Sequence, residues 1–293
     1  MNTPTVNTPT VTNSPTVEAA ATADGYALGR SAEEYERVRR QALAWEPATT
    51  TLLDKLGVRR GASCLDVGSG PGEIMRVLAE RVGPAGRVLG IDVDREQSAI
   101  ALARLHADGH YQCAIDVRPL RGDEPVPGGP FDLVFARLLL FHLPDRAAAL
   151  ARLWEAVAPG GCLVVQEYHV PSALTEPALP GFEQVKGLIV GAFRAAGADP
   201  EIGARLPLLF AEAGIGSPDG TDVAGLLMPL SRGRGMVLDT ARSLLPVALA
   251  AGLVTAEAAE LMLTSAAQEV DQYPDHQMLW PLLMGAWKYR DRT

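Results

Sequence analysis

Three glycines stand at alternating positions in CLDVGSGPGEIM, residues 64–75, directly after a short apolar run that ends in an acid. Gly68, Gly70 and Gly72 permit a tight turn from a strand into a helix and a close approach of the backbone to a ligand. The dinucleotide motif GxGxxG would place its third glycine at Glu73, and an acid at a helix start repels a pyrophosphate. The GK[ST] of a nucleotide-triphosphate loop is also missing. The spacing predicts a ligand without phosphates and disfavours an NAD-dependent oxidoreductase.

Two further acids stand where later strands are expected to end. Asp92, in VLGIDVD, lies where a carboxylate can accept hydrogen bonds from both hydroxyls of a ribose. Asp116, in CAIDV, is positioned to receive the amino group of an adenine, with the backbone N–H of Val117 beside it. Together with Asp66, these acids would line the carboxyl edge of a parallel sheet, where open α/β folds bind ligands. The alternative is that each acid caps the helix that follows it.

The elements that position these residues alternate along the chain from Ala62 onward. Short apolar runs predict strands at 64–67, 87–93, 111–117, 131–136 and 162–170, and helical patterns predict helices at 73–82, 95–107 and 145–157. Strands joined by helices of this length form right-handed βαβ units. The pattern therefore predicts an α/β fold with a doubly wound, mostly parallel, Rossmann-like sheet.

The flanking segments differ from this core in composition. Residues 1–24 open with a Thr/Pro/Asn repeat that cannot bury apolar surface, and are predicted to be a disordered tail. Residues 25–58 are predicted to form two helices, with Ser31 and Glu34 as the capping box of the first. Residues 59–293 would form the main domain.

Beyond residue 171 helical patterns dominate. They predict helical insertions at about 172–213 and 230–275, and we expect these late helices to cover one face of the sheet. Strand patterns are found at 221–228 and 277–289.

Composition limits the class of protein and its partners. Apolar residues make up 47% of the chain and charged residues 21%, as in ordinary globular proteins, and the net charge of −9 disfavours nucleic acid as a partner. The longest apolar stretch, 244–254, is shorter than the about 18 to 20 residues that span a bilayer. No membrane span or secretory signal is readable, so we expect a cytoplasmic protein. Cys64, Cys113 and Cys162 stand singly among apolar neighbours, which favours core cysteines over a metal or disulfide site.

Four segments in order, LDVGSGPG, GIDVD, CAIDV and FDLVFARLLLFHL, resemble the successive motifs of class I S-adenosylmethionine-dependent methyltransferases. The resemblance covers roughly residues 26–170 and is greatest to the bacterial small-molecule group, which includes menaquinone/ubiquinone-type C-methyltransferases and secondary-metabolite enzymes. It implies a seven-stranded sheet of order 3-2-1-4-5-7-6 whose last strand pair is antiparallel, with 277–289 as the reversed strand. It also implies S-adenosylmethionine as cofactor and S-adenosylhomocysteine as product.

The same resemblance implies individual cofactor contacts. Gly68 and Gly70 would contact the methionine portion, Asp92 the ribose, Asp116 and Val117 the adenine, and Ala136 and Arg137 would lie beside the sulfonium. The predicted cofactor-binding set also includes Tyr26, Gln41, Asp66, Ser69 and Val93.

Two of these assignments have alternatives. Tyr26 and Gln41 belong to an N-terminal helix of a kind that acts as a lid in similar enzymes, and the alternative is an amphipathic helix packed on the sheet. Arg137 could hold a carboxylate or a neighbouring acid.

Methyl transfer requires an acceptor positioned in a dry pocket, and a base only where the acceptor must lose a proton. His142 is the best candidate base because imidazole titrates near neutrality, with a packing role as the alternative. Glu167, Tyr168 and His169 end the fifth predicted strand, and one of them is expected to touch substrate. Alternation directs Glu167 and His169 to one side and Tyr168 to the other. Our catalytic candidates are His142, Glu167 and His169, with no metal.

The predicted function is methyl transfer to carbon or oxygen of a hydrophobic small molecule, in secondary metabolism. The segment after the fourth strand lacks the [ND]PP[YF] of nucleobase methyltransferases, which disfavours nucleic-acid methylation. The acceptor would lie under helices near 182–196 and 235–272. The alternative is a non-catalytic S-adenosylmethionine-binding protein of the same fold. The oligomeric state stays open, a homo-oligomer included.

Overall fold

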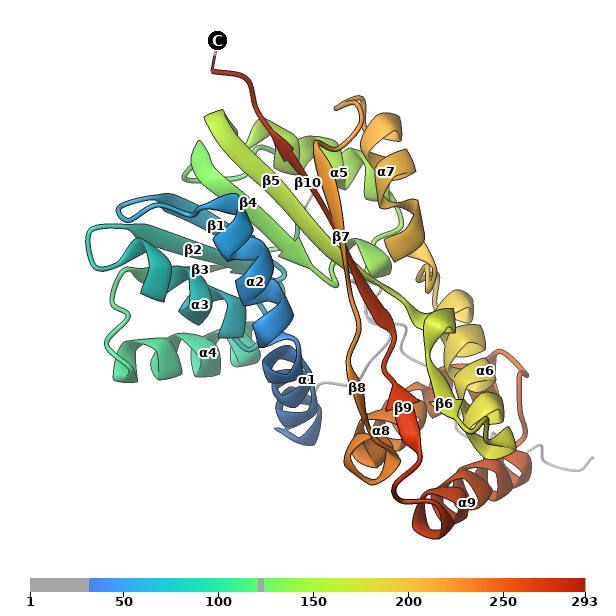
Figure 1. Cartoon of the computed structure of the whole chain (residues 1–293). Helices are drawn as coiled ribbons and strands as arrows, with labels where there is room; N and C mark the ends of the chain where they lie inside the picture. The colour runs from blue at the N-terminus through green and yellow to red at the C-terminus, as the bar shows by residue number, and fades with distance from the viewer. Residues whose placement is uncertain (1–31, 121–123, 293) are drawn as a thin grey trace, which may run out of the picture.

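The computed structural model describes residues 32–120 and 124–292. They form a large sheet covered by helices, and a group of helices with a smaller sheet lies beyond one end of it (Figure 1). The predicted tail, the predicted cap residue Ser31 and the predicted cofactor contact Tyr26 lie outside the described residues.

The large sheet has the strand order β3-β2-β1-β4-β5-β10-β7. Strands β1 to β5 pair in parallel, while β10 runs antiparallel to both β5 and β7. The predicted topology is therefore confirmed, with β10 as the reversed strand. The bounds are β1 (Ser63–Val67), β2 (Arg87–Asp92), β3 (Cys113–Val117), β4 (Phe131–Arg137), β5 (Val157–His169), β7 (Gly220–Ala224) and β10 (Leu282–Tyr289).

Helices cover both faces of this sheet, and alternating strand residues separate the two layers. On β4, Leu133 and Phe135 belong to the core shared with α2 and α3, whereas Val134 and Ala136 belong to the core shared with α5 and α7. Helices α3 and α4 begin and end where the sequence predicts. The helix bounds are α2 (Glu46–Leu56), α3 (Glu73–Val82), α4 (Arg95–Ala107), α5 (Arg146–Glu155) and α7 (Ile202–Glu212).

The remaining late elements form a separate layer, which we call the cap. It consists of α6 (Pro180–Ala195), α8 (Leu230–Ala250) and α9 (Ala256–Gln272), packed with a three-stranded antiparallel sheet of order β6-β9-β8. Its strands are β6 (Leu174–Glu176), β8 (Leu227–Pro229) and β9 (Gln277–Leu279). The cap follows the carboxyl end of β5 (Figure 1).

The position of the cap corrects one prediction. Of the late helices only α7 lies on a face of the large sheet, while α6, α8 and α9 pack mainly on one another. Both late strand patterns are also divided: 221–228 supplies β7 and β8, and 277–289 supplies β9 and β10. Each segment therefore passes from one sheet into the other, which ties the cap to the large sheet at two places.

The first described helix, α1 (Ala32–Ala44), connects the two layers, since it contacts α3 on one side and α8 of the cap on the other. Its buried face holds Glu34 and Arg37 besides Ala42. Trp45, 1% exposed, follows directly and precedes α2. A helix whose buried face carries an ion pair lines a polar cavity more readily than it completes an apolar core.

Candidate functional site

A cavity of about 370 Å³ opens at the carboxyl ends of β1, β2 and β4. The strand register aligns these ends, because Val67 lies opposite both Ile91 and Ala136. The walls come from the glycine loop after β1, the turn after β2, the turn after β4, and helix α1. Open α/β sheets bind their ligands at this edge.

The glycine loop uses its backbone amides within the protein. All three glycines have φ between 47° and 81°, in the left-handed region that favours glycine. The N–H groups of Gly68 and Ser69 donate to the carbonyl oxygen of Ile91 at 2.8 and 3.1 Å, and that of Gly70 donates to the Asp92 carboxylate at 2.8 Å. Amides bonded in this way do not form a phosphate cradle, in agreement with a ligand that lacks phosphates.

Asp92 lines the cavity at the end of β2. Its two carboxylate oxygens accept from the N–H groups of Gly70 and Asp94, at 2.8 and 2.9 Å. Burial is the main cause that raises the pKa of this carboxyl. The helix cap is supplied by Asp94, whose Oδ1 accepts from the N–H of Gln97 at 2.9 Å. The residue that caps the helix is therefore Asp94 and not Asp92. The carboxylate oxygens of Asp92 can accept further hydrogen bonds from a ligand in the cavity.

An acid and a guanidinium face the same cavity from β1 and β4. Asp66 is 2% exposed, and its Oδ2 has no hydrogen-bond partner among the described residues. Burial raises the pKa of this carboxyl to about 7, against the lowering effect of Arg137. Arg137 donates to Thr49 Oγ1 at 3.1 Å and to the carbonyl oxygen of Ala42 at 3.5 Å. No carboxylate of the described residues forms an ion pair with Arg137, so neither side chain is fully satisfied within that part of the chain.

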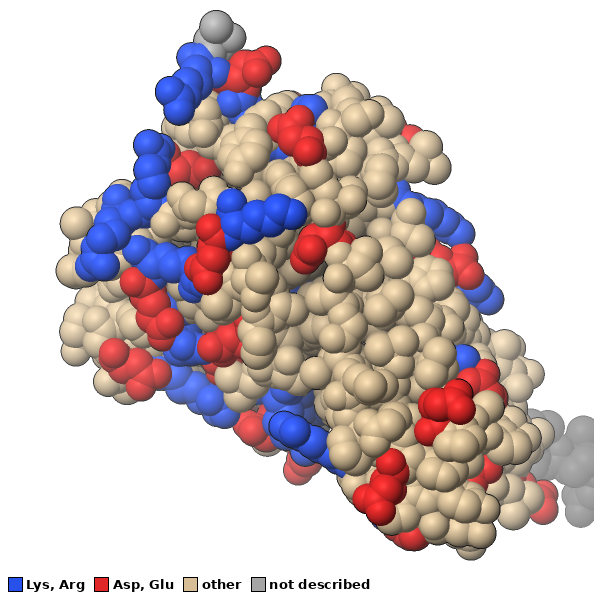
Figure 2. Space-filling model, in the orientation of Figure 1, with Lys and Arg blue, Asp and Glu red and all other residues tan. Residues whose placement is uncertain are grey.

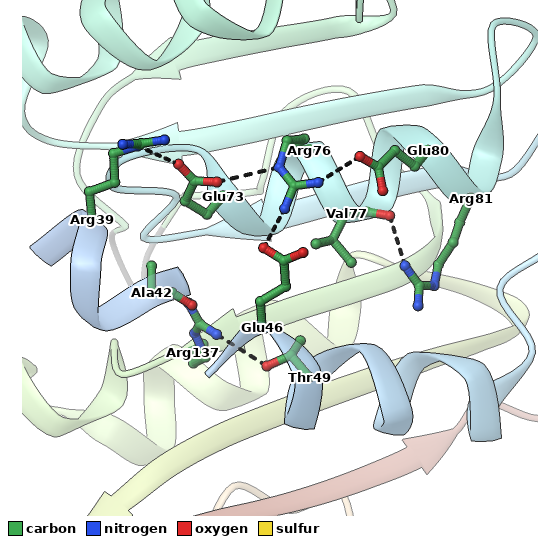
Figure 3. A network of polar contacts seen from close by, with 10 residues as sticks. All are labelled: Arg39, Ala42, Glu46, Thr49, Glu73, Arg76, Val77, Glu80, Arg81 and Arg137. Atoms are coloured by element: carbon green, nitrogen blue, oxygen red, sulfur yellow. Dashed lines mark hydrogen bonds and ion pairs between the residues drawn. The ribbon is translucent and has the colours of Figure 1, made fainter. Parts of the chain in front are cut away.

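A network of charges holds the N-terminal helices against α3 (Figure 3). Glu73, 7% exposed, accepts from Arg39 Nε at 2.7 Å and from Arg76 Nε at 3.4 Å. Arg76 also pairs with Glu46 at the start of α2 and with Glu80 at 2.6 Å. The acid that interrupts the dinucleotide motif therefore anchors α1 and α2 beside the cavity. A further bond, from Tyr35 Oη to Asp94 Oδ2 at 2.9 Å, joins α1 to the start of α4.

A second cavity, of about 100 Å³, adjoins the first on the side of the cap. Four residues line both cavities: Arg37, Gln41, Leu138 and His142. The remaining walls are largely apolar and come from β5 and its continuation, α6, α8 and the segment between β9 and β10. We call the two the large and the small cavity.

Polar contacts between α1 and the cap form part of the junction. Arg37 donates to both carboxylate oxygens of Glu34, at 2.8 and 2.6 Å, and both side chains are 6% exposed. Arg37 Nη1 also donates to Gln41 Oε1 at 3.1 Å and to Thr240 Oγ1 on α8 at 3.3 Å. The predicted contact residue Gln41 is thus held at the boundary of the two cavities.

His142 lies at the same boundary, in the short helix η1 (Leu140–His142) after β4. Burial, followed by the charges of Arg146 and Arg37, lowers the pKa of its imidazole to about 4. The ring is therefore neutral at physiological pH, and its low basicity does not favour the role of general base. Its ring centroid lies 4.9 Å from that of Phe141 in an edge-to-face arrangement, so the packing role also holds.

The three candidates at the end of β5 have different surroundings. Tyr168 lines the small cavity, whereas Glu167 and His169 line neither cavity. Glu167 is fully buried, and its Oε1 accepts from the N–H groups of Leu139 and Leu140 at 3.0 and 2.7 Å. Burial raises the pKa of its carboxyl to about 8. Of the three, the side chain that reaches a cavity is that of Tyr168, which does not favour catalysis by Glu167 or His169.

The other predicted cofactor contacts divide into two groups. Ser69 and Val93 line the large cavity together with Gly68 and Gly70. Asp116, Val117 and Ala136 do not. The Asp116 side chain is 43% exposed and lies 3.8 Å from Arg118, while Ala136 is fully buried. The wall next to β3 is instead formed by Arg118, Pro119 and Leu120, just before a gap in the described residues.

The cysteines, the potential metal ligands, the helix lengths and the surface charges relate to the predictions made from composition. The three cysteines are buried and unpaired, as predicted. Within 32–120 and 124–292, no cluster of potential metal ligands is found, and no helix is both long and apolar enough to cross a membrane. On the face shown in Figure 2, basic side chains are interspersed with acidic ones.

Several lining residues were missed by the sequence analysis. They include the Glu34–Arg37 ion pair, Thr240 and the two tryptophans Trp45 and Trp280. An acid and an arginine three apart on a helix are typical of a solvated surface pair. Their burial results from the docking of α8, more than 200 residues away, since Ser243 also donates to Glu34 at 3.0 Å. A contact of that sequence separation leaves no local signal.

Residues 65–165 match a protein family described as a methyltransferase domain. Among characterised relatives, the chain is 31% identical to a ubiquinone/menaquinone biosynthesis C-methyltransferase of Hahella chejuensis over 120 residues, which are 41% of this chain and 48% of the relative. It is 35% identical to nocamycin O-methyltransferase of Saccharothrix syringae over 136 residues, 46% of this chain and 48% of the relative. The chain spans about half the length of the curated relatives it matches.

The fold also has a match among solved structures. A cyclopropane-fatty-acyl-phospholipid synthase-like protein from Lactobacillus casei superposes with a TM-score of 0.55 at 20% identity, covering 90% of this chain and 96% of that protein. At this level of identity the likeness concerns the fold alone.

Proposed function

We propose that this member of the class I S-adenosylmethionine-dependent methyltransferases transfers a methyl group to carbon or oxygen of a hydrophobic small molecule. The observation that carries the proposal is the pair of adjoining cavities. The large one carries the cofactor motifs, and the small one is apolar, so a donor and an acceptor can meet at their junction.

The residues of the large cavity fit S-adenosylmethionine. The orphaned Oδ2 of Asp66 is an acceptor for the ammonium of the methionine portion, and the guanidinium of Arg137, which lacks an ion-pair partner among the described residues, suits its carboxylate. Asp92 retains acceptor positions for a ribose. S-adenosylmethionine, when bound, supplies a methyl group on a positively charged sulfur.

The protein's own contribution is to position the acceptor and to exclude water. Helix α1 covers the large cavity through its bonds to Glu73 and Asp94, and the cap covers the small one. His142 lies at the junction and is the candidate base by position, although its lowered pKa suits only an acceptor whose proton is readily lost. The apolar walls favour an acceptor with an aromatic or aliphatic body. The similarity to nocamycin O-methyltransferase and to a ubiquinone/menaquinone biosynthesis C-methyltransferase supports a small-molecule acceptor without selecting the acceptor atom, and we infer a role in secondary metabolism.

Calorimetry tests the cofactor part of this proposal. We expect S-adenosylhomocysteine to bind and NAD not to bind. Binding of NAD alone would support an oxidoreductase and overturn the proposal.

Radiolabelled methyl transfer tests the enzymatic part. The protein is incubated with S-adenosylmethionine labelled at the methyl group and a panel of phenols, β-dicarbonyl compounds and quinols, and organic extracts are counted. We expect label in at least one extract and a reduced rate for His142→Ala. Binding of S-adenosylhomocysteine without transfer to any acceptor would favour a non-catalytic binding protein of the same fold.

A further inference from the structure

Three aromatic side chains from distant parts of the chain meet between the two cavities. Trp45 stands between α1 and α2, Tyr168 lies on β5, and Trp280 lies between β9 and β10. The indole N–H groups of Trp45 and Trp280 both donate to the hydroxyl oxygen of Tyr168, at 2.5 and 3.0 Å. All three side chains are buried, with exposures of 1%, 8% and 6% in chain order.

The hydrogen bonds of this hydroxyl are incomplete. A phenol oxygen has two acceptor positions and one hydrogen to donate. The two indoles, which can only donate, occupy both acceptor positions. Among residues 32–120 and 124–292, no acceptor is bonded to the hydroxyl hydrogen. A buried donor without an acceptor costs free energy. The hydroxyl is therefore suited to donate a hydrogen bond to an atom of a bound ligand.

The surroundings of the Tyr168 hydroxyl determine its position between the cavities and its protonation state. Tyr168 and Trp280 line the small cavity and Trp45 lines the large one, so the hydroxyl lies near the boundary of the two. The charges that act on the phenol come from Arg137 and Arg37, and both lower its pKa. Burial outweighs them and raises the pKa to about 12, so the group keeps its proton at physiological pH. The hydroxyl is therefore a protonated donor that feels the charges of two guanidinium groups, of which that of Arg37 is paired with Glu34.

We propose that the Tyr168 hydroxyl, fixed by Trp45 and Trp280, donates a hydrogen bond to an oxygen of the methyl acceptor. The acceptor is thus an apolar molecule that carries an electron-rich oxygen, as in a phenol, a phenolate or the enolate of a carbonyl compound. Two N–H donors on the phenol oxygen polarise its O–H bond and strengthen this donation. A purely hydrocarbon acceptor, or one that offers only a donor, leaves the hydroxyl unsatisfied. This inference rests on the proposed function, because it assigns the small cavity to the acceptor.

A pair of probes of similar size tests the inference. The affinities of 4-fluorophenol and 4-fluorotoluene for the protein saturated with S-adenosylhomocysteine are measured by fluorine NMR. Their ratio is compared between the wild type and Tyr168→Phe, which keeps the ring. We expect the preference for the phenol to fall about 2- to 10-fold, the effect of one hydrogen bond. Tyr111→Phe is the matched control, because Tyr111 is 77% exposed and lies outside both cavities.

A second measurement uses the wild type, because Tyr168→Phe leaves two buried indole N–H groups without an acceptor and can impair folding. The chain has four tryptophans, whose indole N–H resonances can be assigned with Trp→Phe variants. We expect 4-fluorophenol, and not 4-fluorotoluene, to shift the resonances of Trp45 and Trp280, while those of Trp154 and Trp287 stay in place. Equal shifts with both probes, or a ratio unaffected by Tyr168→Phe, would overturn the inference. Failure of S-adenosylhomocysteine to bind the wild type would instead overturn the proposed function.

Discussion

Arg39 Nε lies 2.7 Å from Glu73 Oε1, and this ion pair joins helix α1 to the first turn of α3 (Figure 3). Glu73 stands where a dinucleotide-binding loop has its third glycine, and so distinguishes this loop from that motif. In the fold Glu73 has a structural function, because it holds α1, which covers the large cavity, against α3.

Loss of this pair should loosen α1. We expect Glu73→Ala to increase amide hydrogen exchange over residues 32–44 and to lower the free energy of unfolding by about 1 kcal/mol, because the arginine partners are partly solvated. Glu36→Ala is the matched control, since Glu36 lies 3.8 Å from the same Arg39 and is 50% exposed. Equal exchange in the two variants would contradict the anchoring role.

The ribose and adenine assignments can be separated by two substitutions. Asp92→Ala should weaken binding of S-adenosylhomocysteine by about 1 to 3 kcal/mol, measured by calorimetry, because a bound ribose would lose its carboxylate partner. Asp116→Ala should have a smaller effect, because Asp116 is exposed and does not line the cavity. If Asp116→Ala weakens binding more than Asp92→Ala does, Asp116 contacts the adenine as the motif predicts, and residues besides Arg118, Pro119 and Leu120 form the wall next to β3.

The raised pKa of Asp66 predicts a pH dependence of cofactor binding. With a pKa of about 7, the carboxyl is protonated below neutrality and ionised above it. An ammonium binds the ionised form, so affinity for S-adenosylhomocysteine should rise as the pH increases from 6 to 8. Asp66→Asn should weaken binding and remove this rise, and a variant that retains the full pH dependence would refute the assignment.

The same group affects stability in the opposite direction. Because its folded-state pKa lies above the ordinary carboxyl value, the folded protein holds more protons than the unfolded chain between these two values. The contribution of Asp66 to stability is therefore present at low pH and lost as the pH rises through about 7. Urea unfolding of the wild type and Asp66→Asn at pH 5 and pH 8 measures this difference, which should be smaller in the variant.

Glu167 offers a test between a structural and a chemical role. With a pKa of about 8 the carboxyl is largely neutral at pH 7, and its Oε1 accepts two backbone N–H groups. Glu167→Gln keeps an acceptor of the same shape and should change the melting temperature little. Glu167→Ala leaves those amides unsatisfied and should cost about 1 to 3 kcal/mol in denaturant unfolding. A Gln variant that folds normally yet has no methyl transfer would restore the catalytic hypothesis.

Local signals account for the parts of the fold that were predicted. Helix α4 begins after Asp94, which caps it, and α2 ends at Gly57, whose φ of 71° requires the glycine. The alternation of elements predicted the parallel sheet and the resemblance implied its strand order, and both depend on short segments. The loop residues Gly68, Gly70 and Asp92, which such local signals indicate, line the large cavity.

The parts that were not predicted depend on contacts between distant segments. The cap sheet pairs β9 with β6 and β8, so no single segment reveals it. The bonds of Tyr168 to Trp45 and Trp280 span 123 and 112 residues. Burial of Glu34 and Arg37, polar residues that a helical pattern assigns to the surface, likewise depends on the docking of α8.

The two adjoining cavities are built largely from different parts of the chain. The large cavity is built mainly from the segment that matches the methyltransferase domain and from α1, whereas Trp280, Phe182, Phe193 and Val237 of the small cavity lie after residue 165, where that match ends. Under the proposed function, substitutions in the cap can therefore alter the choice of acceptor while the residues proposed to hold the donor stay unchanged. A lineage can in this way acquire new acceptors without re-evolving its means of holding the methyl donor.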